Sequence, residues 1–440
     1  MGNTNLRTPH IDKMAETGVN FTRAVSGSPL CSPFRGSLLS GLYPHQCVPG
    51  HDCAMADGIV TLGDVLQVAG YSTAYFGKWH VDGLENRGGV SREAFQTVSK
   101  PRRRGFDTWL GYENNNSPWD CWLHGHRDDG TDVPHYLLDG YETDCLTELL
   151  LEHVDRKAQQ ERPFFAVLSV QPPHAPYVAP EEWMQRHSAE DVQLRPNVPP
   201  VESYREERKA DLAGYYSMIE NLDWNVGRVI DRLVDLDIYK NTVVIFFSDH
   251  GDMHGSQGRI YKCTPWEESI RIPFIVSGGY SELSRGQKTD CLINHIDMAP
   301  TTLGLCGVSV PENMTGFDYS CVIRGEAVEH VPDSAFLQLV DPGWGDVGYA
   351  VDRDRPWRGI VTRDGWKFAA LEHQPWVMYN LNEDPYETIN LVFDFRFAEK
   401  RKELQMLLEQ WIARTGDEFI LPEPITGTYL KHHGLREISD

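Results

Sequence analysis

Three short apolar runs along the chain are each followed at once by a loop rich in polar groups. The runs are residues 72–76, 164–170 and 242–247, and their apolar positions are continuous rather than alternating. Continuous runs of this length are typical of strands that are buried on both faces of a parallel sheet. The pattern therefore predicts three buried strands at these positions.

Segments with apolar residues at helical spacing lie between these runs. They cover residues 8–18, 61–70, 144–160 and 218–236. The alternation of strands and helices predicts an α/β fold, with a mainly parallel, doubly wound sheet covered by helices. Ligands bind beyond the carboxyl ends of the strands in such sheets, so we expect the three polar loops to converge on one crevice.

The pattern changes in the last quarter of the chain. Residues 359–371 predict a strand, an Asp-Gly turn and a returning strand, and residues 376–387 predict a strand that runs into a turn. A helical pattern follows at residues 399–415. We therefore expect a main domain at residues 1–340 and a smaller α+β subdomain at residues 341–440.

The composition excludes several classes of protein. The 440 residues are 40% hydrophobic, which is ample for a large core, and the net charge of −23 disfavours nucleic acid and anionic membranes as partners. The nine cysteines lack the paired spacing of a disulfide framework or a zinc site. No apolar run approaches the roughly 18 residues of a membrane span, and the polar N-terminus does not resemble a signal peptide.

A lone cysteine, Cys31, lies in the segment SGSPLCSPFRGSLLSG. Ser32 suits a helix N-cap, Pro33 suits the first helical position and Gly41 suits the helix end. The segment predicts a short helix with Cys31 just before its N-terminus, where the helix dipole stabilises an anion. The simpler interpretation is a small buried cysteine beside a surface arginine, Arg35.

Other groups with useful chemistry follow the apolar runs. Asp249 and His250 are adjacent, and a carboxylate and an imidazole can both bind a divalent cation. Lys78 and His80 are two residues apart, so in an extended loop they would face the same side and suit one anion. His174 lies among prolines, which would hold its imidazole in place as a general acid.

Each of these groups also has a simpler structural interpretation. An Asp-His pair after a strand is often part of a hydrogen-bonded loop, and Lys78 and His80 can be neighbours by chance. A histidine in a proline-rich turn is common. Lys262 precedes the apolar run at residues 272–276. A surface lysine whose methylene groups lie along apolar side chains would give the same sequence pattern.

Taken together, the segments resemble the type I sulfatases of the alkaline phosphatase superfamily. CSPFRGSLLSG is similar to the C-x-P-x-R segment of that family. The resemblance continues in the family's order through TPHIDKMAETGVNFTRA, GYSTAYFGKWH, PPHAPY, FFSDHGDMHGSQG, YKCTPWEESIRIPFIV and MYNLNEDPYETINL. It implies that residues 1–340 form the catalytic domain of an arylsulfatase-like sulfuric ester hydrolase.

The resemblance implies a modified residue at the centre of the site. In sulfatases a formylglycine-generating maturation enzyme oxidises the cysteine at the position of Cys31 to formylglycine, and it is thought to read Pro33 and Arg35. The hydrated aldehyde supplies a hydroxyl that attacks the sulfur of a sulfate ester, and its second hydroxyl expels sulfate again. Arg35 would orient this diol.

Roles for the remaining candidates come from the same resemblance. Lys78 and Lys262 would hold the sulfuryl oxygens, His80 would assist the elimination of sulfate, and His174 would protonate the leaving alcohol. A divalent cation, usually calcium in the family, would be held by Cys31 in its modified form together with Asp249 and His250.

The chain departs from the family pattern at its start. Sulfatases begin with a buried strand that ends in an Asp-Asp pair, and this chain opens on the segment that follows that strand, GNTNLRTPHID. We expect a sheet without a central strand, too few metal ligands and weak activity, and we interpret the start as a misplaced start codon or a fragment. The chain as written is cytoplasmic, whereas a lost export signal would make it periplasmic or secreted.

Two other functions fit the same residues. A phosphonate monoester or phosphodiester hydrolase of the same superfamily can use the same formylglycine. A degenerate sulfatase-like protein that binds sulfate esters without catalysis would explain the missing carboxylates. We expect the long polar and aromatic segment from Tyr112 to Tyr136 to form a loop over the site, and its tryptophans and histidines favour a carbohydrate sulfate as substrate.

Overall fold

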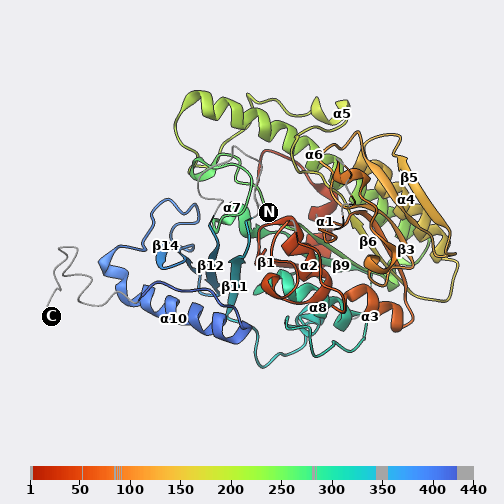
Figure 1. The fold of residues 1–440 in the computed structure, drawn as a ribbon. Helices are drawn as coiled ribbons and strands as arrows, with labels where there is room; N and C mark the ends of the chain where they lie inside the picture. Colours follow the sequence, from red (N-terminus) through yellow and green to blue (C-terminus); the bar gives the residue numbers. More distant parts are fainter. Residues whose placement is uncertain are drawn as a thin grey trace.

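The computed structural model of the protein has layers of helices on both faces of β-sheet strands, with a separate C-terminal sheet beside them (Figure 1). It describes residues 3–423 apart from 52, 84–85, 87, 89, 91, 280–282, 284 and 343–354. The predicted α/β fold class is confirmed, although the main sheet strands include antiparallel members. Residues 424–440 of the predicted C-terminal subdomain lie outside the described residues.

The first group of main strands has the order β10-β1-β9-β7, and β8 also pairs with β1. Strand β10 is parallel to β1, whereas β9 is antiparallel to both β1 and β7. Strands β1 and β7 therefore point the same way. The bounds are Val19–Val25 for β1, Val243–Phe247 for β7, Arg271–Ile272 for β8, Phe274–Gly278 for β9 and Gln287–Asn294 for β10.

The second group of main strands has the order β5-β4-β3-β2-β6. Strand β2 is parallel to both β3 and β6, and β4 and β5 continue the sheet as antiparallel strands. The bounds are Ser72–Lys78 for β2, Thr108–Tyr112 for β3, Trp122–His126 for β4, Asp132–Leu137 for β5 and Phe164–Ser169 for β6.

The three strands predicted from apolar runs are present as β2, β6 and β7, but only β2 is buried as expected. Every residue of β6 and β7 is half-buried. The reason is that each of these two strands ends its hydrogen-bonded group, so within the described chain each has an edge with no partner strand.

The segment from Tyr112 to Tyr136 is not one continuous loop as predicted, because it contains two strands. Residues 122–126 and 132–136 of the segment lie in β4 and β5, an antiparallel pair at the outer edge of the second group, and residues 113–121 form a loop before them. Its alternating residues supply one apolar face, because Leu123, Val133 and Tyr136 pack into the core between this sheet and helix α4. The polar positions between them gave the segment the composition of a loop.

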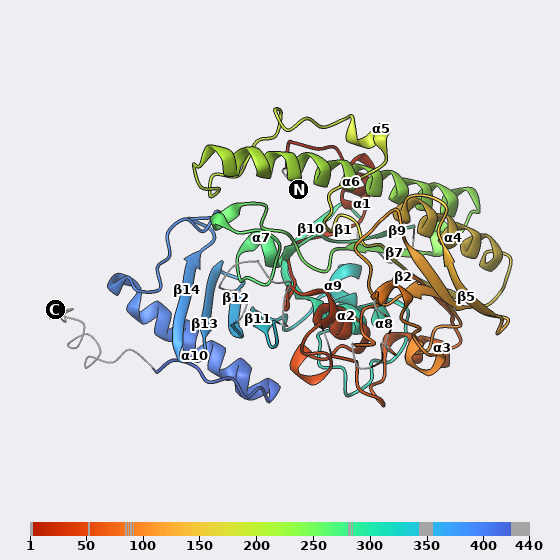
Figure 2. The ribbon, with the colours of Figure 1, turned by 45° about the horizontal axis from the view of Figure 1, so that its top comes forward.

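Helices cover both faces of the main strands. On one face α1, α4 and α6 pack together, and α6 is a single long helix that runs across the molecule (Figure 2). On the other face α2, α3 and α8 pack together, with α9 against α8. The bounds are Pro9–Thr17 for α1, Cys31–Ser40 for α2, Leu62–Val68 for α3, Glu142–Lys157 for α4, Glu181–Met184 for α5, Glu202–Asp235 for α6, Met298–Leu305 for α8 and Ser320–Arg324 for α9.

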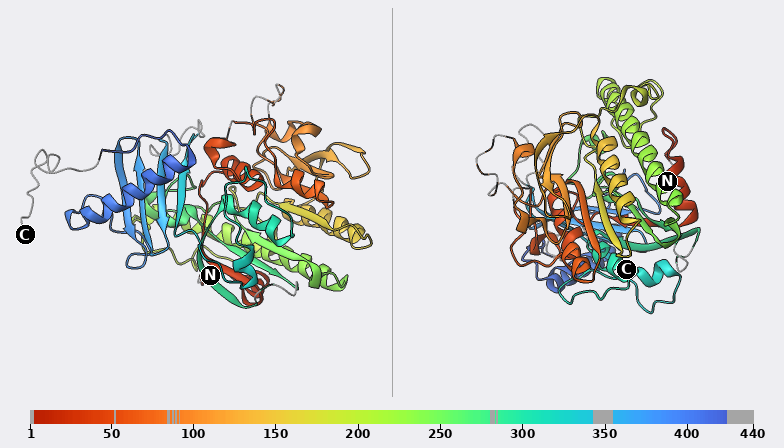
Figure 3. Two further views of the ribbon diagram at one scale, coloured as in Figure 1. Left: turned by 90° about the horizontal axis from the view of Figure 1, so that it is seen from below. Right: turned by 90° about the vertical axis from the view of Figure 1, so that its right-hand side faces the viewer.

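The C-terminal sheet is antiparallel, with the order β11-β12-β13-β14, and helix α10 lies across it (Figure 3). The hairpin predicted for residues 359–371 is present as β12 and β13. The bounds are Ser334–Leu339 for β11, Trp357–Thr362 for β12, Trp366–Leu371 for β13, Gln374–Asn380 for β14 and Ala398–Thr415 for α10. The domain boundary at residue 340 stays a prediction.

Candidate active site

Cys31 is the first residue of α2 and is buried, with 2% of its surface exposed. The helix predicted after Cys31 is present, and it ends at Gly41 in a left-handed conformation (φ 66°) as expected for a C-cap glycine. The predicted start was wrong by two residues, because Leu30 rather than Ser32 is the N-cap. Cys31 therefore lies in the first turn of the helix, where the backbone N–H groups have no partner within the helix.

Two cationic or polar side chains contact the Cys31 sulfur. His250 Nε2 lies 3.2 Å from Sγ, and Lys262 Nζ donates to Sγ over 3.3 Å. Burial alone would raise the pKa of the Cys31 thiol, but Lys262, Lys78 and His250 outweigh it and hold the pKa well below its usual value. In contrast, burial raises the pKa of Cys47, nearby but without these neighbours, to about 11.

Arg35 lies one helical turn after Cys31 and joins the ends of two strands. Its guanidinium donates to the carbonyl oxygen of Lys78 over 2.7 Å and to Ser169 Oγ over 2.6 Å. It also lies 3.9 Å from a carboxylate oxygen of Asp249. Arg35 is buried rather than on the surface, so the interpretation of a surface arginine is wrong.

Lys78 and His80 both reach the site at the carboxyl end of β2. The expectation that they share a side because the loop is extended is wrong, since His80 has a left-handed backbone (φ 57°). This conformation is uncommon for a residue with a Cβ atom, and such strain gathers at functional sites. Burial and the charge of Lys78 lower the pKa of His80 well below its usual value, so the imidazole is neutral.

His51 is a site residue that the sequence analysis missed. Ligand atoms of His51, His80 and Cys31 lie within 4.8 Å of one another, and the His51 and His80 rings lie 4.8 Å apart between centroids. His51 Nε2 is buried and has no hydrogen-bond partner among the described residues. The only sequence signal was a histidine in a segment, VPGHD, that shows no strand or helix period.

His174 and Lys262 come from two separate loops that line the same cavity as Cys31. Burial, together with the charges of Lys262 and Lys78, lowers the pKa of His174 to about 3. The residues on either side of Lys262, Tyr261 and Cys263, both have left-handed backbones (φ 63° and 74°). This strained turn directs Lys262 into the protein, so the interpretation of a surface lysine is wrong.

Asp252 fixes the loop that carries Lys262. Its carboxylate accepts hydrogen bonds from Tyr177 Oη over 2.7 Å and from the Tyr261 amide over 3.0 Å. Tyr177 is three residues beyond His174, so one buried carboxylate ties together the loops of His174 and Lys262. Burial alone would raise the pKa of Asp252, but His254, the hydrogen bond from Tyr177 and the charge of Lys262 lower it.

Cys31, Asp249 and His250 form a group that can hold a metal ion, with ligand atoms that lie within 4.8 Å of one another. The Nδ1 atom of His250 lies 2.9 Å from the Gly251 carbonyl oxygen, which assigns the hydrogen to Nδ1 and leaves Nε2 as a ligand. A carboxylate and an imidazole fit a divalent cation. Calcium prefers roughly six to eight oxygen ligands, which is more than these described residues supply.

All the candidate residues named in the sequence analysis therefore lie around one cavity or contact each other there. The residues that line the cavity include Cys31, Arg35, Lys78, His174, Asp249, His250 and Lys262. His80 contributes from beside Cys31. A potential nucleophile, buried cations, a carboxylate and imidazoles at one point can bind an oxyanion, stabilise its charge and transfer a proton.

Comparison with known proteins identifies the family of this site. Residues 2–308 match the Sulfatase family, and residues 255–414 match the family described as N-sulphoglucosamine sulphohydrolase, C-terminal. An ulvan-active sulfatase of Formosa agariphila is 32% identical over 428 residues, which cover 95% of this chain and 78% of the relative. An N-acetylglucosamine-6-O-sulfatase of Bacteroides thetaiotaomicron is 23% identical, over 93% of this chain and 82% of the relative.

Solved structures share the fold. The YidJ protein of Bacteroides fragilis superposes with a TM-score of 0.82 at 25% identity, covering 95% of this chain and 92% of that one. A phosphonate monoester hydrolase of Agrobacterium radiobacter superposes with a TM-score of 0.75 at 20% identity, over 94% and 92% of the two chains. The second likeness concerns the fold alone.

The fold and the converging side chains define an ester hydrolase of the alkaline phosphatase superfamily. The chain belongs to the sulfatase family, and it is a sulfuric ester hydrolase. Enzymes of this family use a formylglycine and a divalent metal ion for catalysis. No helix among the described residues is both long and apolar enough to cross a bilayer.

Proposed function

We propose that this sulfatase uses Cys31 as its formylglycine precursor and acts on a carbohydrate sulfate. The observation that carries the first part is the pair of contacts from His250 and Lys262 to the Cys31 sulfur, at 3.2 and 3.3 Å. A group that gains negative charge at this position is stabilised at once by a helix N-terminus and buried cations. Once oxidised and hydrated, residue 31 would supply the hydroxyl that attacks the ester sulfur.

The buried cations would bind the sulfuryl group. Lys78 and Lys262 both act on the charge of Cys31, and both are almost fully buried, with 3% and 9% of their surfaces exposed. A buried ammonium without water around it stabilises a developing oxyanion far more strongly than an exposed one. The Arg35 guanidinium is fixed by hydrogen bonds to the ends of two strands. It would therefore orient residue 31 and would not move with the substrate.

His174 would donate the proton to the leaving alcohol. Its pKa of about 3 in the free protein results from burial and from the charges of Lys262 and Lys78. A sulfate ester bound between these two lysines would offset their charges, so binding would raise the pKa of His174 and favour the protonated ring. His80, which stays neutral beside Cys31, would act as the base for release of sulfate.

Asp249 and His250 would hold the metal ion with the modified residue 31. We propose calcium, because Asp249 and the hydrated residue 31 would both offer hard oxygen ligands. The ion would supply positive charge at the sulfuryl oxygens. A formylglycine-generating enzyme is the proposed partner for maturation, and it would act on the segment from Cys31 to Arg35.

The names of the relatives support the substrate class. One relative is an N-acetylglucosamine-6-O-sulfatase and another is an ulvan-active sulfatase. We therefore propose a sulfated sugar as substrate. Its sulfate group would bind to the buried lysines, Lys78 and Lys262. The particular sugar and the position of its ester would depend on surfaces outside the cluster around Cys31.

The test begins with the chain produced together with a formylglycine-generating enzyme. We expect the tryptic peptide of residues 24–35 to carry an aldehyde, and we expect turnover of 4-nitrophenyl sulfate and of N-acetylglucosamine 6-sulfate above that of the Cys31→Ala variant. Cys321→Ser, at a half-exposed cysteine away from the site, is the matched control and should keep the wild-type rate.

Three results would contradict the proposal. Full turnover by a protein whose residue 31 remains a thiol would remove the formylglycine from the reaction. A methylphosphonate aryl ester turned over faster than the aryl sulfate would identify a phosphonate hydrolase instead. Wild-type turnover no higher than that of Cys31→Ala for every ester would support a non-catalytic binding protein.

A further inference from the structure

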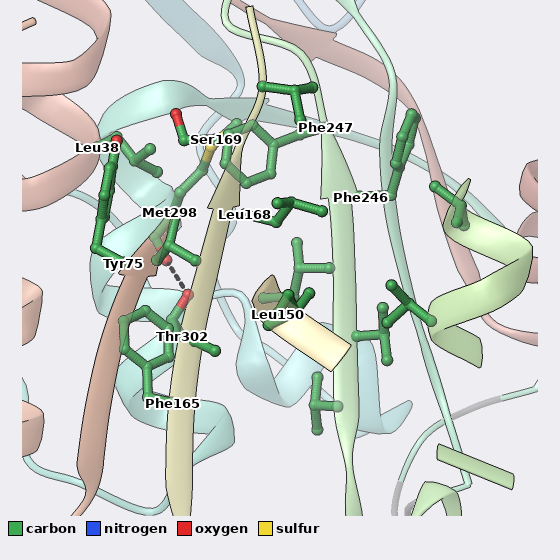
Figure 4. Close-up of a pocket in the computed structure, with 18 of the residues that line it drawn as sticks. Leu38, Tyr75, Leu150, Phe165, Leu168, Ser169, Phe246, Phe247, Met298 and Thr302 are labelled. Carbon is green, nitrogen blue, oxygen red and sulfur yellow. Dashed lines mark hydrogen bonds between the residues drawn. The ribbon is translucent and has the colours of Figure 1, made fainter. Parts of the chain in front are cut away.

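Helix α4 begins with a glutamate, Glu142, whose side chain has no exposed surface. The chain runs from α4 into β6 through a short connection, so the helix and the strand lie antiparallel and the start of α4 lies beside the end of β6. The two elements pack together, and the close-up of the cavity shows Leu150 of α4 near Leu168 of β6 (Figure 4). Glu142 is therefore buried at the point where β6 ends and the turn of His174 begins.

One carboxylate oxygen of Glu142 accepts two hydrogen bonds. Its Oε1 accepts from Tyr112 Oη over 2.6 Å and from the backbone N–H of Gln171 over 2.7 Å. Tyr112 is the last residue of β3, and Gln171 lies in the turn that follows β6. Short hydrogen bonds to a carboxylate are the strong kind. Glu142 therefore fixes the end of one strand relative to the turn that follows another.

Each of these contacts leads to a residue of the candidate site. Tyr112 pairs with Lys78 across the parallel ladder of β2 and β3. The carbonyl oxygen of Gln171 accepts a hydrogen bond from the N–H of His174 over 3.2 Å. The described residues that line the cavity include Lys78, Gln171 and His174 but not Glu142. Glu142 is therefore linked to the site on two sides, through one intervening residue in each case.

The burial of Glu142 carries a cost that packing alone does not explain. Its second oxygen, Oε2, is buried and has no hydrogen-bond partner among the described residues. Burial raises the pKa of Glu142 to about 7, although its hydrogen bonds and the charges of Lys78 and Arg35 oppose this rise. An apolar side chain at this position would avoid the cost of burying a carboxyl group. The cost indicates that the two hydrogen bonds of Oε1 serve the site.

We propose that Glu142 is a positioning residue for sulfate ester hydrolysis, which holds the turn of His174 at a fixed place relative to the end of β2. It acts through Tyr112 and Gln171 and does not touch the substrate. The inference rests on the proposed function, in which Lys78 binds the sulfuryl oxygens and His174 protonates the leaving alcohol. A small change in the separation of these two groups leaves the sulfate bound but moves the proton donor away from the leaving oxygen.

The basicity of the leaving group reports the position of His174. The phenolate of 4-methoxyphenyl sulfate is more basic than that of 4-nitrophenyl sulfate, so its departure depends more on protonation. The two esters have similar sizes, so they make similar demands on the binding of the sulfuryl group. The ratio of their kcat/KM values does not change when part of the enzyme is unfolded, because the folded fraction cancels.

The test measures both esters with variants of the matured full chain. Glu142→Leu removes both hydrogen bonds, and we expect kcat/KM for 4-methoxyphenyl sulfate to fall about 10–100-fold and its ratio to the 4-nitrophenyl value to fall at least about fivefold. Glu142→Gln keeps an accepting oxygen in the same place, so both values should stay within about threefold of the wild type. Glu152→Leu, at an exposed position on the same helix, is the matched control and should change neither value.

A further variant, Tyr112→Phe, leaves the contact between Glu142 and Gln171 intact. It should lower both kcat/KM values by a similar factor and keep their ratio within about twofold of the wild type. An unchanged ratio in Glu142→Leu, or a Glu142→Gln enzyme as impaired as Glu142→Leu, would overturn the inference. Failure of the proposed function gives a different result, because the wild type would then turn over neither ester faster than Cys31→Ala.

Discussion

Lys262 is the residue whose place depends most on local backbone strain, because left-handed residues flank it on both sides. It contacts the Cys31 sulfur and is almost completely buried. We expect Lys262→Ala to lower kcat/KM for an aryl sulfate by about 10²–10³-fold, the usual cost of removing one group that stabilises an oxyanion. Steady-state kinetics of the matured enzyme measure this change.

The matched control is Lys288→Ala, since Lys288 is an exposed lysine on β10. Its kcat/KM should remain within about twofold of the wild type, because an exposed charge far from the site contributes little. A Lys262→Ala enzyme as active as Lys288→Ala would remove Lys262 from the binding of the sulfuryl group.

His51 provides a second prediction at the residue scale. Its ring lies against His80, and its Nε2 has no partner among the described residues, so we expect it to hold His80 in position. The change His51→Phe should lower kcat about tenfold or more with little effect on KM, as is typical of residues that orient a functional group. The change His51→Gln, which keeps a polar end, should restore part of the loss.

The unfolding midpoint and the pH dependence of kcat separate positioning from stability. We expect both variants to unfold at the wild-type midpoint, while the pH profile of His51→Phe shifts because the neighbour of His80 has lost its nitrogen atoms. If kcat and its pH profile are the same in all three proteins, His51 only fills space.

At the scale of elements, a buried ion cluster joins the C-terminal sheet to the start of α7 (Glu267–Ile270). Lys367 on β13 is fully buried and lies 2.7 Å from both Glu267 and Glu387. Burial and the second carboxylate raise the pKa of Glu387 to about 7, although Lys367 opposes this. Glu267 begins α7, five residues beyond Lys262, so the cluster supports the loop of Lys262 from the C-terminal sheet.

We expect Lys367→Met to lower the free energy of unfolding by about 3–5 kcal/mol, because it leaves two buried carboxylates without a counter-charge. Denaturant titration measures this loss. Lys402→Met, at an exposed position on α10, is the control and should change stability by less than about 0.5 kcal/mol. A loss as small as that of the control would show that the two carboxylates need no cation.

The burial of His153 on α4 lowers the stability of the protein at acidic pH. Its ring is fully buried, and neither ring nitrogen has a partner among the described residues. Burial, with the charges of Lys157 and Arg156, lowers its pKa from 6.5 to about 4. The unfolded chain therefore binds this proton first as the pH falls below 6.5, and stability is lost down to about pH 4.

We expect His153→Phe to reduce the loss of stability between about pH 8 and pH 5 by on the order of 2 kcal/mol. Phenylalanine keeps the aromatic packing against Phe76 and Phe164 but cannot take up a proton. Urea unfolding at the two pH values measures the difference. Parallel pH curves for the wild type and the variant would show that His153 does not titrate with unfolding.

For the whole molecule, the net charge of −23 is a source of self-repulsion. The Debye length falls from about 30 Å at 0.01 M salt to about 8 Å at 0.15 M, so salt screens this repulsion over the dimensions of the protein. We therefore expect the unfolding midpoint to rise between these two salt concentrations at pH 8. Near the isoelectric point of about 5.1 the rise should be much smaller, and an equal rise at both pH values would contradict the explanation.

Much of the fold and of the site could be predicted from local pattern. Apolar runs located β2, β6 and β7, helical spacing located helices on both faces, and an Asp-Gly turn located the hairpin of β12 and β13. The candidate residues around Cys31 converge because polar loops follow parallel strands. The extended segment from Tyr112 to Tyr136 was misjudged, since its alternating strands have the polar content of a loop.

The sequence by itself determined the class of fold, because spacing reports which side chains share a face. It determined the family and the residues that can carry the chemistry through the ordered segments that resemble the sulfatases. Only the tertiary structure decided that β6 and β7 each lack a partner strand on one edge within the described chain, that His51 lies against His80, and that Asp252 joins the loops of His174 and Lys262. The physical reason is that periodicity records how deeply a segment is buried, whereas its neighbours come from distant parts of the chain. These tertiary contacts form when the helix and sheet layers pack together, and the local sequence pattern does not predict them.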